Sequence, residues 1–220
     1  MINRRQAALA TAAAATLAAA PALAQPVALK EGSNFRRLPQ PLPSTPGKVE
    51  VVEFFWYGCP HCYLLEPYLE AWTKTLPKQV EFRPVHIFIR EQSRPHQRLA
   101  HTLQVMGVEG RVRMPIFNAI HQQGNPLDTP EAMLKLLTPL GIDGAKFMAA
   151  YNSFGVNSRV NGANQLANAY RVDGVPALGI GGQFVTSPAL AQEGQRVAEG
   201  EANRRALAIA DQLIGRLIKA

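Results

Sequence analysis

The chain contains two cysteines, and both lie in one short segment, GCPHC at 58–62. The residues before it, VEVVEFFWY at 49–57, are β-branched and aromatic, which predicts a buried central strand. Pro60 can occupy the first turn of a helix without losing a backbone hydrogen bond. Apolar residues then recur at helical spacing from Leu64 to Trp72. The pattern therefore places Cys59 between a buried strand and the N-terminus of a helix over 60–75.

Such a cysteine pair could be a structural disulfide, half of a metal site or a catalytic dithiol. A disulfide between Cys59 and Cys62 would close a very short loop and remove little unfolded-state entropy. A chain of 220 residues also buries enough surface to fold without one. A zinc site needs about four ligands, and we expect the scattered remaining histidines to be surface or loop residues: His86, His96, His101 and His121. A catalytic dithiol, with no metal, is the favoured interpretation.

The predicted position of Cys59 gives it a chemical role. Backbone N–H groups and the positive end of the dipole meet at a helix N-terminus, and both should lower the pKa of the Cys59 thiol. His61 lies between the two sulfurs, where an imidazole would favour the thiolate further. Cys62 comes one turn later and should be less exposed. We therefore expect Cys59 to attack and Cys62 to resolve the mixed disulfide.

Glu53 is an acid inside the predicted buried strand, six residues before Cys59. One interpretation is that a buried, partly neutral carboxyl beneath the dithiol moves a proton to or from Cys62. The other is that Glu53 lies at the rim of the sheet with a basic partner.

The first 24 residues have the pattern of a secretory signal peptide. A basic start that includes Arg4 and Arg5 precedes an apolar stretch over 7–20, and Ala22 and Ala24 fit a cleavage site near Ala24. The Arg pair fits either the general or the twin-arginine export route. Removal of the signal peptide leaves 21 basic and 16 acidic residues, a net charge of +5. The basic residues form no long run and do not alternate with aromatic ones, so no nucleic-acid partner is expected.

The rest of the chain predicts a small α/β domain that is interrupted by helices. A short edge strand near 35–38 is expected before the central strand, and a second strand is expected over 80–89. Four short helices should follow, over 96–106, 115–123, 129–137 and 143–151. The chain should end with a helix over 158–170, a hairpin with strands over 176–180 and 183–186, and a helix over 198–218. We predict a thioredoxin-like domain over 25–90 and 157–220, with an inserted all-α domain over 91–156.

Two motifs together resemble a known family. EFFWYGCPHC at 53–62 and GVPALGIGG at 174–182 are similar to the DsbA family of exported thiol-disulfide oxidoreductases, and the resemblance extends over about 30–220. It implies a thioredoxin fold with an inserted helical domain and a redox-active Cys59–Cys62 pair around Pro60 and His61. It also implies a buried glutamate at Glu53.

The resemblance also implies the surroundings of the dithiol. Val175-Pro176 matches a loop with a cis-proline that lies against the two sulfurs, whereas the sequence alone leaves cis and trans open. Outward-facing backbone groups of Val175 would pair with a substrate chain as an added strand. A DsbB-type membrane quinone reductase would reoxidise the protein in the periplasm, and the sequence shows no motif for a cofactor of its own.

Three functions remain to be distinguished. The favoured one is a monomeric oxidase that donates its disulfide to reduced exported proteins. A disulfide isomerase or reductase is the first alternative, although the family's isomerases carry a dimerisation domain and only about 24 residues of the mature chain precede Val49. A peptide-binding folding factor with an incidental dithiol is the second.

Overall fold

The computed structural model describes residues 27–219, so the signal peptide predicted over 1–24 and its cleavage near Ala24 lie outside the described residues. Along the chain the elements are β1 (Arg36–Arg37), β2 (Val49–Phe55), α1 (Pro60–Thr73), β3 (Val80–His86), α2 (Ser93–Val105), α3 (Glu109–His121), α4 (Pro130–Leu137), η1 (Thr138–Leu140), α5 (Gly144–Tyr151), α6 (Phe154–Ala169), β4 (Ala177–Ile180), β5 (Phe184–Thr186), α7 (Pro188–Ala191) and α8 (Glu199–Lys219).

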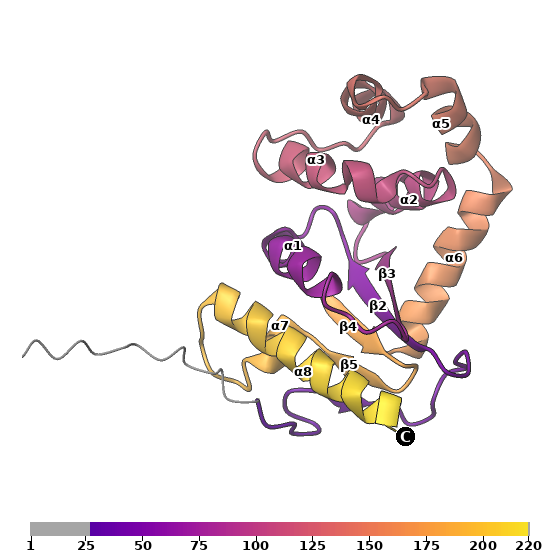
Figure 1. The fold of residues 1–220 in the computed structure, drawn as a ribbon. Helices are drawn as coiled ribbons and strands as arrows, with labels where there is room; N and C mark the ends of the chain where they lie inside the picture. The colour runs from indigo at the N-terminus through magenta and orange to yellow at the C-terminus, as the bar shows by residue number, and fades with distance from the viewer. Residues whose placement is uncertain (1–26, 220) are drawn as a thin grey trace, which may run out of the picture.

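The strands form one sheet in the order β1-β5-β4-β2-β3. β2 is parallel to β3 and antiparallel to β4, and β1 pairs with β5 as the short edge strand that was predicted. Helices α1 and α8 cover one face of the sheet and α6 covers the other (Figure 1). Because both faces of β2 are covered, its residues are almost entirely buried. This burial explains the near-continuous apolar sequence of the strand.

Helices α2 to α5 gather beyond one end of the sheet (Figure 1). Their apolar side chains pack with the residues that follow β2, and this core includes Trp56, Tyr57, Phe117 and both cysteines. The chain therefore has the thioredoxin fold with an inserted helical domain, as predicted. The dithiol lies where the two parts share a core. Among residues 27–219, no helix combines the length and the apolar character that crossing a bilayer would need.

Several boundaries differ from the prediction. Helix α3 begins at Glu109, not at 115, so Pro115 lies inside the helix instead of starting it. Strand β3 ends at His86, three residues early, and accommodates Pro84 because β3 is an edge strand. β4 begins one residue after Pro176, and the four-residue helix α7 was not predicted.

The expectation that four histidines lie on the surface or in loops is wrong for three of them. His86 ends β3, and His96 and His101 lie on α2; all three side chains are buried. The ring of His86 accepts a hydrogen bond from the N–H of Tyr57 (3.2 Å), and His96 accepts one from the indole of Trp56 (3.0 Å). These rings satisfy polar groups at the junction of the two domains, and burial lowers the pKa of each. His121, at the end of α3, is half-buried.

Candidate active site

The structure places Cys59 where β2 gives way to α1, as predicted. Cys59 has extended backbone angles and is the N-cap residue of α1; its carbonyl accepts the N–H of Tyr63 (3.1 Å). Its own N–H closes a turn onto the carbonyl of Trp56 (2.9 Å). Both cysteines are free thiols, with Cys59 6% exposed and Cys62 fully buried. The two sulfurs therefore differ in access, and Cys59 is the one that a second molecule can reach.

The surroundings of Cys59 stabilise its thiolate. Its pKa is lowered to about 6, first by a hydrogen bond from the Cys62 thiol. Burial opposes this shift, and hydrogen bonds from the backbone N–H groups of Cys62 and His61 and the charge of His61 add to it. The helix N-terminus thus helps to lower the pKa of Cys59, as predicted, but the largest cause of the shift is the thiol of Cys62. Burial raises the pKa of Cys62 well above the ordinary value, as do the hydrogen bond to Cys59 and the charges of Cys59 and Glu53.

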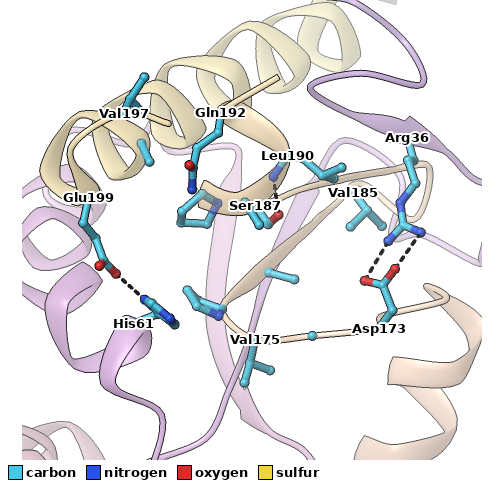
Figure 2. Close-up of a pocket in the computed structure, with 16 residues that line it drawn as sticks. Arg36, His61, Asp173, Val175, Val185, Ser187, Leu190, Gln192, Val197 and Glu199 are labelled. Atoms are coloured by element: carbon cyan, nitrogen blue, oxygen red, sulfur yellow. Dashed lines mark hydrogen bonds and ion pairs between the residues drawn. The ribbon is translucent and has the colours of Figure 1, made fainter. Parts of the chain in front are cut away.

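His61 is exposed and forms an ion pair with the last helix. Its Nδ1 lies 2.6 Å from the Oε1 of Glu199, the first residue of α8 (Figure 2). The hydrogen bond to Glu199 raises the pKa of His61, with smaller contributions from the charges of Glu199 and Cys59. Glu199 therefore favours the charged imidazole, the form that stabilises a thiolate.

The peptide bond between Val175 and Pro176 is cis, as the resemblance implied. The carbonyl oxygen of Val175 lies 3.4 Å from the Sγ of Cys59 and accepts a hydrogen bond from the thiol. This carbonyl, one of the two backbone groups that we expect to pair with an added strand, thus lies beside the reactive sulfur. The loop before β4 therefore lies directly against Cys59.

A groove of about 310 Å³ opens beside this loop. Its lining combines polar residues with apolar ones, and the apolar ones include Val175, Pro176, Pro188 and Leu190. Charged pairs flank it: His61 with Glu199 on one side, and Arg36 with Asp173, whose contacts are 3.3 Å, on the other (Figure 2). An extended chain with an apolar side chain could lie here beside Cys59.

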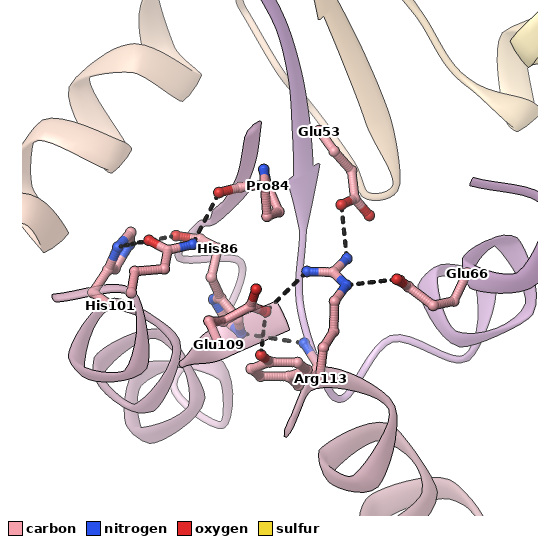
Figure 3. Close-up of polar contacts among 9 residues, drawn as sticks. Glu53, Glu66, Pro84, His86, His101, Glu109 and Arg113 are labelled. Carbon is pink, nitrogen blue, oxygen red and sulfur yellow. Dashed lines mark hydrogen bonds and ion pairs between the residues drawn. The ribbon is translucent and has the colours of Figure 1, made fainter. Parts of the chain in front are cut away.

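Glu53 is completely buried in β2, so it does not lie at the rim of the sheet. It does have a basic partner, as the rim interpretation required. Its Oε2 accepts a hydrogen bond from Arg113 of α3 at 2.7 Å (Figure 3). Burial raises the pKa of Glu53 to about 8, against the lowering effect of Arg113. A carboxyl in this range can hold or release a proton near neutral pH.

The sequence analysis missed Arg113 and Glu199. Glu109 and Arg113 are four residues apart, a helical spacing that was visible in the sequence, but a helix assumed to start at Pro115 excluded both. Glu199 lies 138 positions from His61, and no local pattern signals such a contact. Within 27–219, no group of three or more His, Cys, Asp or Glu residues is arranged to hold a metal ion.

Comparison with known proteins identifies the family. Residues 50–194 match the DSBA-like thioredoxin domain family. The chain belongs to the DsbA family. It is 45% identical over 170 residues to the thiol:disulfide interchange protein DsbA of Burkholderia cepacia, covering 76% of this chain and 80% of the relative. It is 39% identical over 206 residues to DsbA of Bordetella parapertussis, covering 93% and 92%.

Solved DsbA structures share the fold. The crystal structure of Pseudomonas aeruginosa DsbA aligns with a TM-score of 0.77 at 38% identity, over 84% of this chain and 93% of that one. DsbA from Xylella fastidiosa aligns with a TM-score of 0.77 at 28% identity, over 87% and 99%. This DsbA-family protein is a thiol-disulfide oxidoreductase.

Proposed function

We propose that this protein is a periplasmic oxidase that donates a Cys59–Cys62 disulfide to reduced exported proteins. The observation that carries the proposal is the position of Cys59 at the N-terminus of α1, where the Cys62 thiol and two helix N–H groups lower its pKa and favour the thiolate. A stable thiolate favours the reduced dithiol over the disulfide. The disulfide is then a strong oxidant, because its reduction produces that stable form.

The reaction begins when a substrate thiolate attacks the Sγ of Cys59 and the Cys59–Cys62 bond breaks. The sulfur of Cys62 leaves as a thiolate and takes a proton. A second substrate thiolate then attacks the substrate sulfur of the mixed disulfide, and Cys59 leaves as its stabilised thiolate. Two electrons pass from the substrate to the protein, and the substrate gains one disulfide.

In this scheme Glu53 exchanges a proton with the buried sulfur of Cys62. Cys62 is fully buried and its pKa is raised, so a group within the protein must supply and remove its proton. Glu53 is also fully buried, its charge acts on Cys62, and its pKa of about 8 suits proton exchange near neutral pH. In the forward reaction Glu53 gives its proton to the Cys62 thiolate.

The groove beside Val175 and Pro176 receives the substrate chain. The cis loop lies against the reactive sulfur, so a chain that pairs with Val175 brings its own cysteine close to Cys59. In the disulfide form Cys59 has no thiol proton to donate to the Val175 carbonyl, so this oxygen can accept a backbone N–H of the incoming chain. Pro60 holds the first turn of α1, and His61 stabilises the thiolate beside it.

The remaining parts of the proposal follow from the family. A DsbB-type membrane quinone reductase reoxidises the dithiol, and the protein acts as a monomer without a cofactor of its own. Export removes residues 1–24. The thioredoxin-like domain comprises 25–90 and 157–220, and the inserted domain comprises 91–156.

The test is disulfide transfer to a reduced peptide that contains two cysteines. The oxidised protein should consume two peptide thiols per molecule, whereas Cys59→Ser should transfer nothing. Reduced Cys62→Ser, mixed with the oxidised peptide, should be trapped as a mixed disulfide through Cys59. A peptide-binding factor would instead bind the peptide equally well with and without Cys59. Transfer that survives Cys59→Ser, or binding without transfer, would refute the proposal.

A further inference from the structure

The buried side chain of Arg113 connects the inserted helices to the strand beneath the dithiol. Arg113 lies on α3 with its side chain 9% exposed, and its guanidinium lies 4.1 Å from the ring centre of Phe55. Each of its three nitrogens contacts a carboxylate from a different element (Figure 3): Glu53 of β2 at 2.7 Å, Glu66 of α1 at 2.7 Å and Glu109 of α3 at 3.1 Å.

The cluster holds more acid than base. Three carboxyl groups share one guanidinium in a dry interior, where unpaired negative charge is costly. Glu109 also accepts a hydrogen bond from the hydroxyl of Tyr57 at 2.6 Å. The second oxygens of Glu53 and Glu66 have no hydrogen-bond partner among the described residues. At least one carboxyl should therefore carry a proton, and burial makes Glu53 the favoured one.

Arg113 and the other two acids have opposite effects on the pKa of Glu53. Its charge lowers the pKa of Glu53, whereas the charges of Glu66 and Glu109 raise it. The charge of Glu53 acts in turn on Cys62. Contacts thus run from α3 of the inserted domain through Arg113 to Glu53, and the charge of Glu53 reaches the buried sulfur.

We propose that Arg113 is a positioning residue for the proton exchange between Glu53 and Cys62. It orients the Glu53 carboxyl, and its positive charge allows Glu53 to release its proton. The inference rests on the proposed function, in which Glu53 serves that sulfur. Without Arg113, Glu53 would keep its proton to higher pH and could not accept one from Cys62. The inserted domain would then contribute to the chemistry as well as to the fold.

The experiment follows Cys62 alone, with dithiobis(nitrobenzoate) as the probe. The Cys59 thiolate attacks the probe disulfide, releases one thionitrobenzoate and forms a mixed disulfide. Cys62 then gives up its proton and attacks the Sγ of Cys59, which releases the second thionitrobenzoate and closes the Cys59–Cys62 disulfide. The rate of the second release, measured against pH, reports the group that takes the proton.

Two substitutions should move this profile in opposite directions. Arg113→Met should raise its midpoint by about one to three pH units, the usual effect of losing an adjacent opposite charge, and Arg113→Lys should raise it less. Glu66→Gln should lower the midpoint, because the charge of Glu66 raises the pKa of Glu53. Glu70→Gln, an exposed position on the same helix, is the matched control and should change nothing. The first release should keep its wild-type pH profile in all four variants.

A background of Glu53→Gln separates positioning from general damage to the structure. There, neither Arg113→Met nor Glu66→Gln should move the profile, because both act through Glu53. An unchanged midpoint in Glu66→Gln, or equal shifts with and without Glu53, would overturn the inference. If Arg113→Met does not fold, Glu66→Gln decides the question, because it keeps the cation and removes a buried charge.

The outcomes also separate this inference from the proposed function. If Glu53→Gln keeps the wild-type profile, Glu53 has no proton role, and the inference falls while disulfide donation stands. If the oxidised protein fails to transfer its disulfide to a peptide, the proposed oxidase falls whatever the profile shows. If transfer and the Glu53 dependence hold but the Arg113 and Glu66 shifts are absent, the inference alone is wrong.

Discussion

The buried carboxyl of Glu53 should make the reduced protein less stable as the pH rises. Its pKa is about 8 in the fold against a model value of 4.5, because burial favours the neutral form. Between these two values the folded chain binds a proton that the unfolded chain does not, so stability is present below 4.5 and is lost as the pH rises toward 8. The loss is about 1.4 kcal/mol per pH unit, or about 3 kcal/mol by pH 7.

Glu53→Gln removes this pH dependence. The free energy of unfolding of the variant, relative to wild type, should increase by about 3 kcal/mol between pH 5 and pH 7. A constant offset from the lost contact with Arg113 does not affect this slope. Urea denaturation of both reduced proteins across this pH range provides the measurement.

Glu50→Gln is the control for this prediction. Glu50 lies on the same strand but its side chain is 41% exposed, and its pair with Arg83 is a surface ion pair of small energy. Its removal should leave the pH dependence of stability close to that of wild type. If the curves for Glu53→Gln and wild type run parallel from pH 5 to pH 7, the reasoning about the buried carboxyl is wrong.

Three further predictions concern the reactive loop. Cys62→Ala should raise the pKa of Cys59 from about 6 toward its ordinary value, because the Cys62 thiol is the main stabiliser of the thiolate; the ultraviolet absorbance of the thiolate measures this, and an unchanged titration would contradict it. Glu199→Gln should lower the pKa of His61, since Glu199 raises it; an NMR titration of the imidazole that matches wild type would exclude the pair in solution. Gly58→Ala would place a methyl group 2.5 Å from the neighbouring indole ring and should cost about 1–3 kcal/mol of stability, the usual effect of overpacking; unfolding at the wild-type urea concentration would disprove it.

Local patterns predicted the part of the site that lies along one stretch of chain. The apolar run before Cys59 and the proline after it determine a strand that leads into a helix, and the structure shows both. The edge strand and the hairpin after Pro176 were predicted from the same kind of signal. These features could be predicted because neighbouring residues alone determine them.

The rest of the site depends on contacts between distant residues. Arg113 reaches Glu53 across 60 positions and Glu199 reaches His61 across 138, so neither pairing has a period or a motif. The buried histidines were misjudged for the same reason. His86 is polar in isolation, yet its ring accepts the N–H of Tyr57 once the inserted domain covers it. Tertiary contacts decide which polar side chains are buried.

The reduction potential of the Cys59–Cys62 pair tests the central claim most directly. Equilibration with glutathione redox buffers at pH 7 gives the potential, and the fraction of reduced protein can be followed by alkylation of the free thiols. The stabilised thiolate of Cys59 predicts a potential well above that of the glutathione couple. A thioredoxin-like potential, about −270 mV, would contradict the oxidase and identify a reductase.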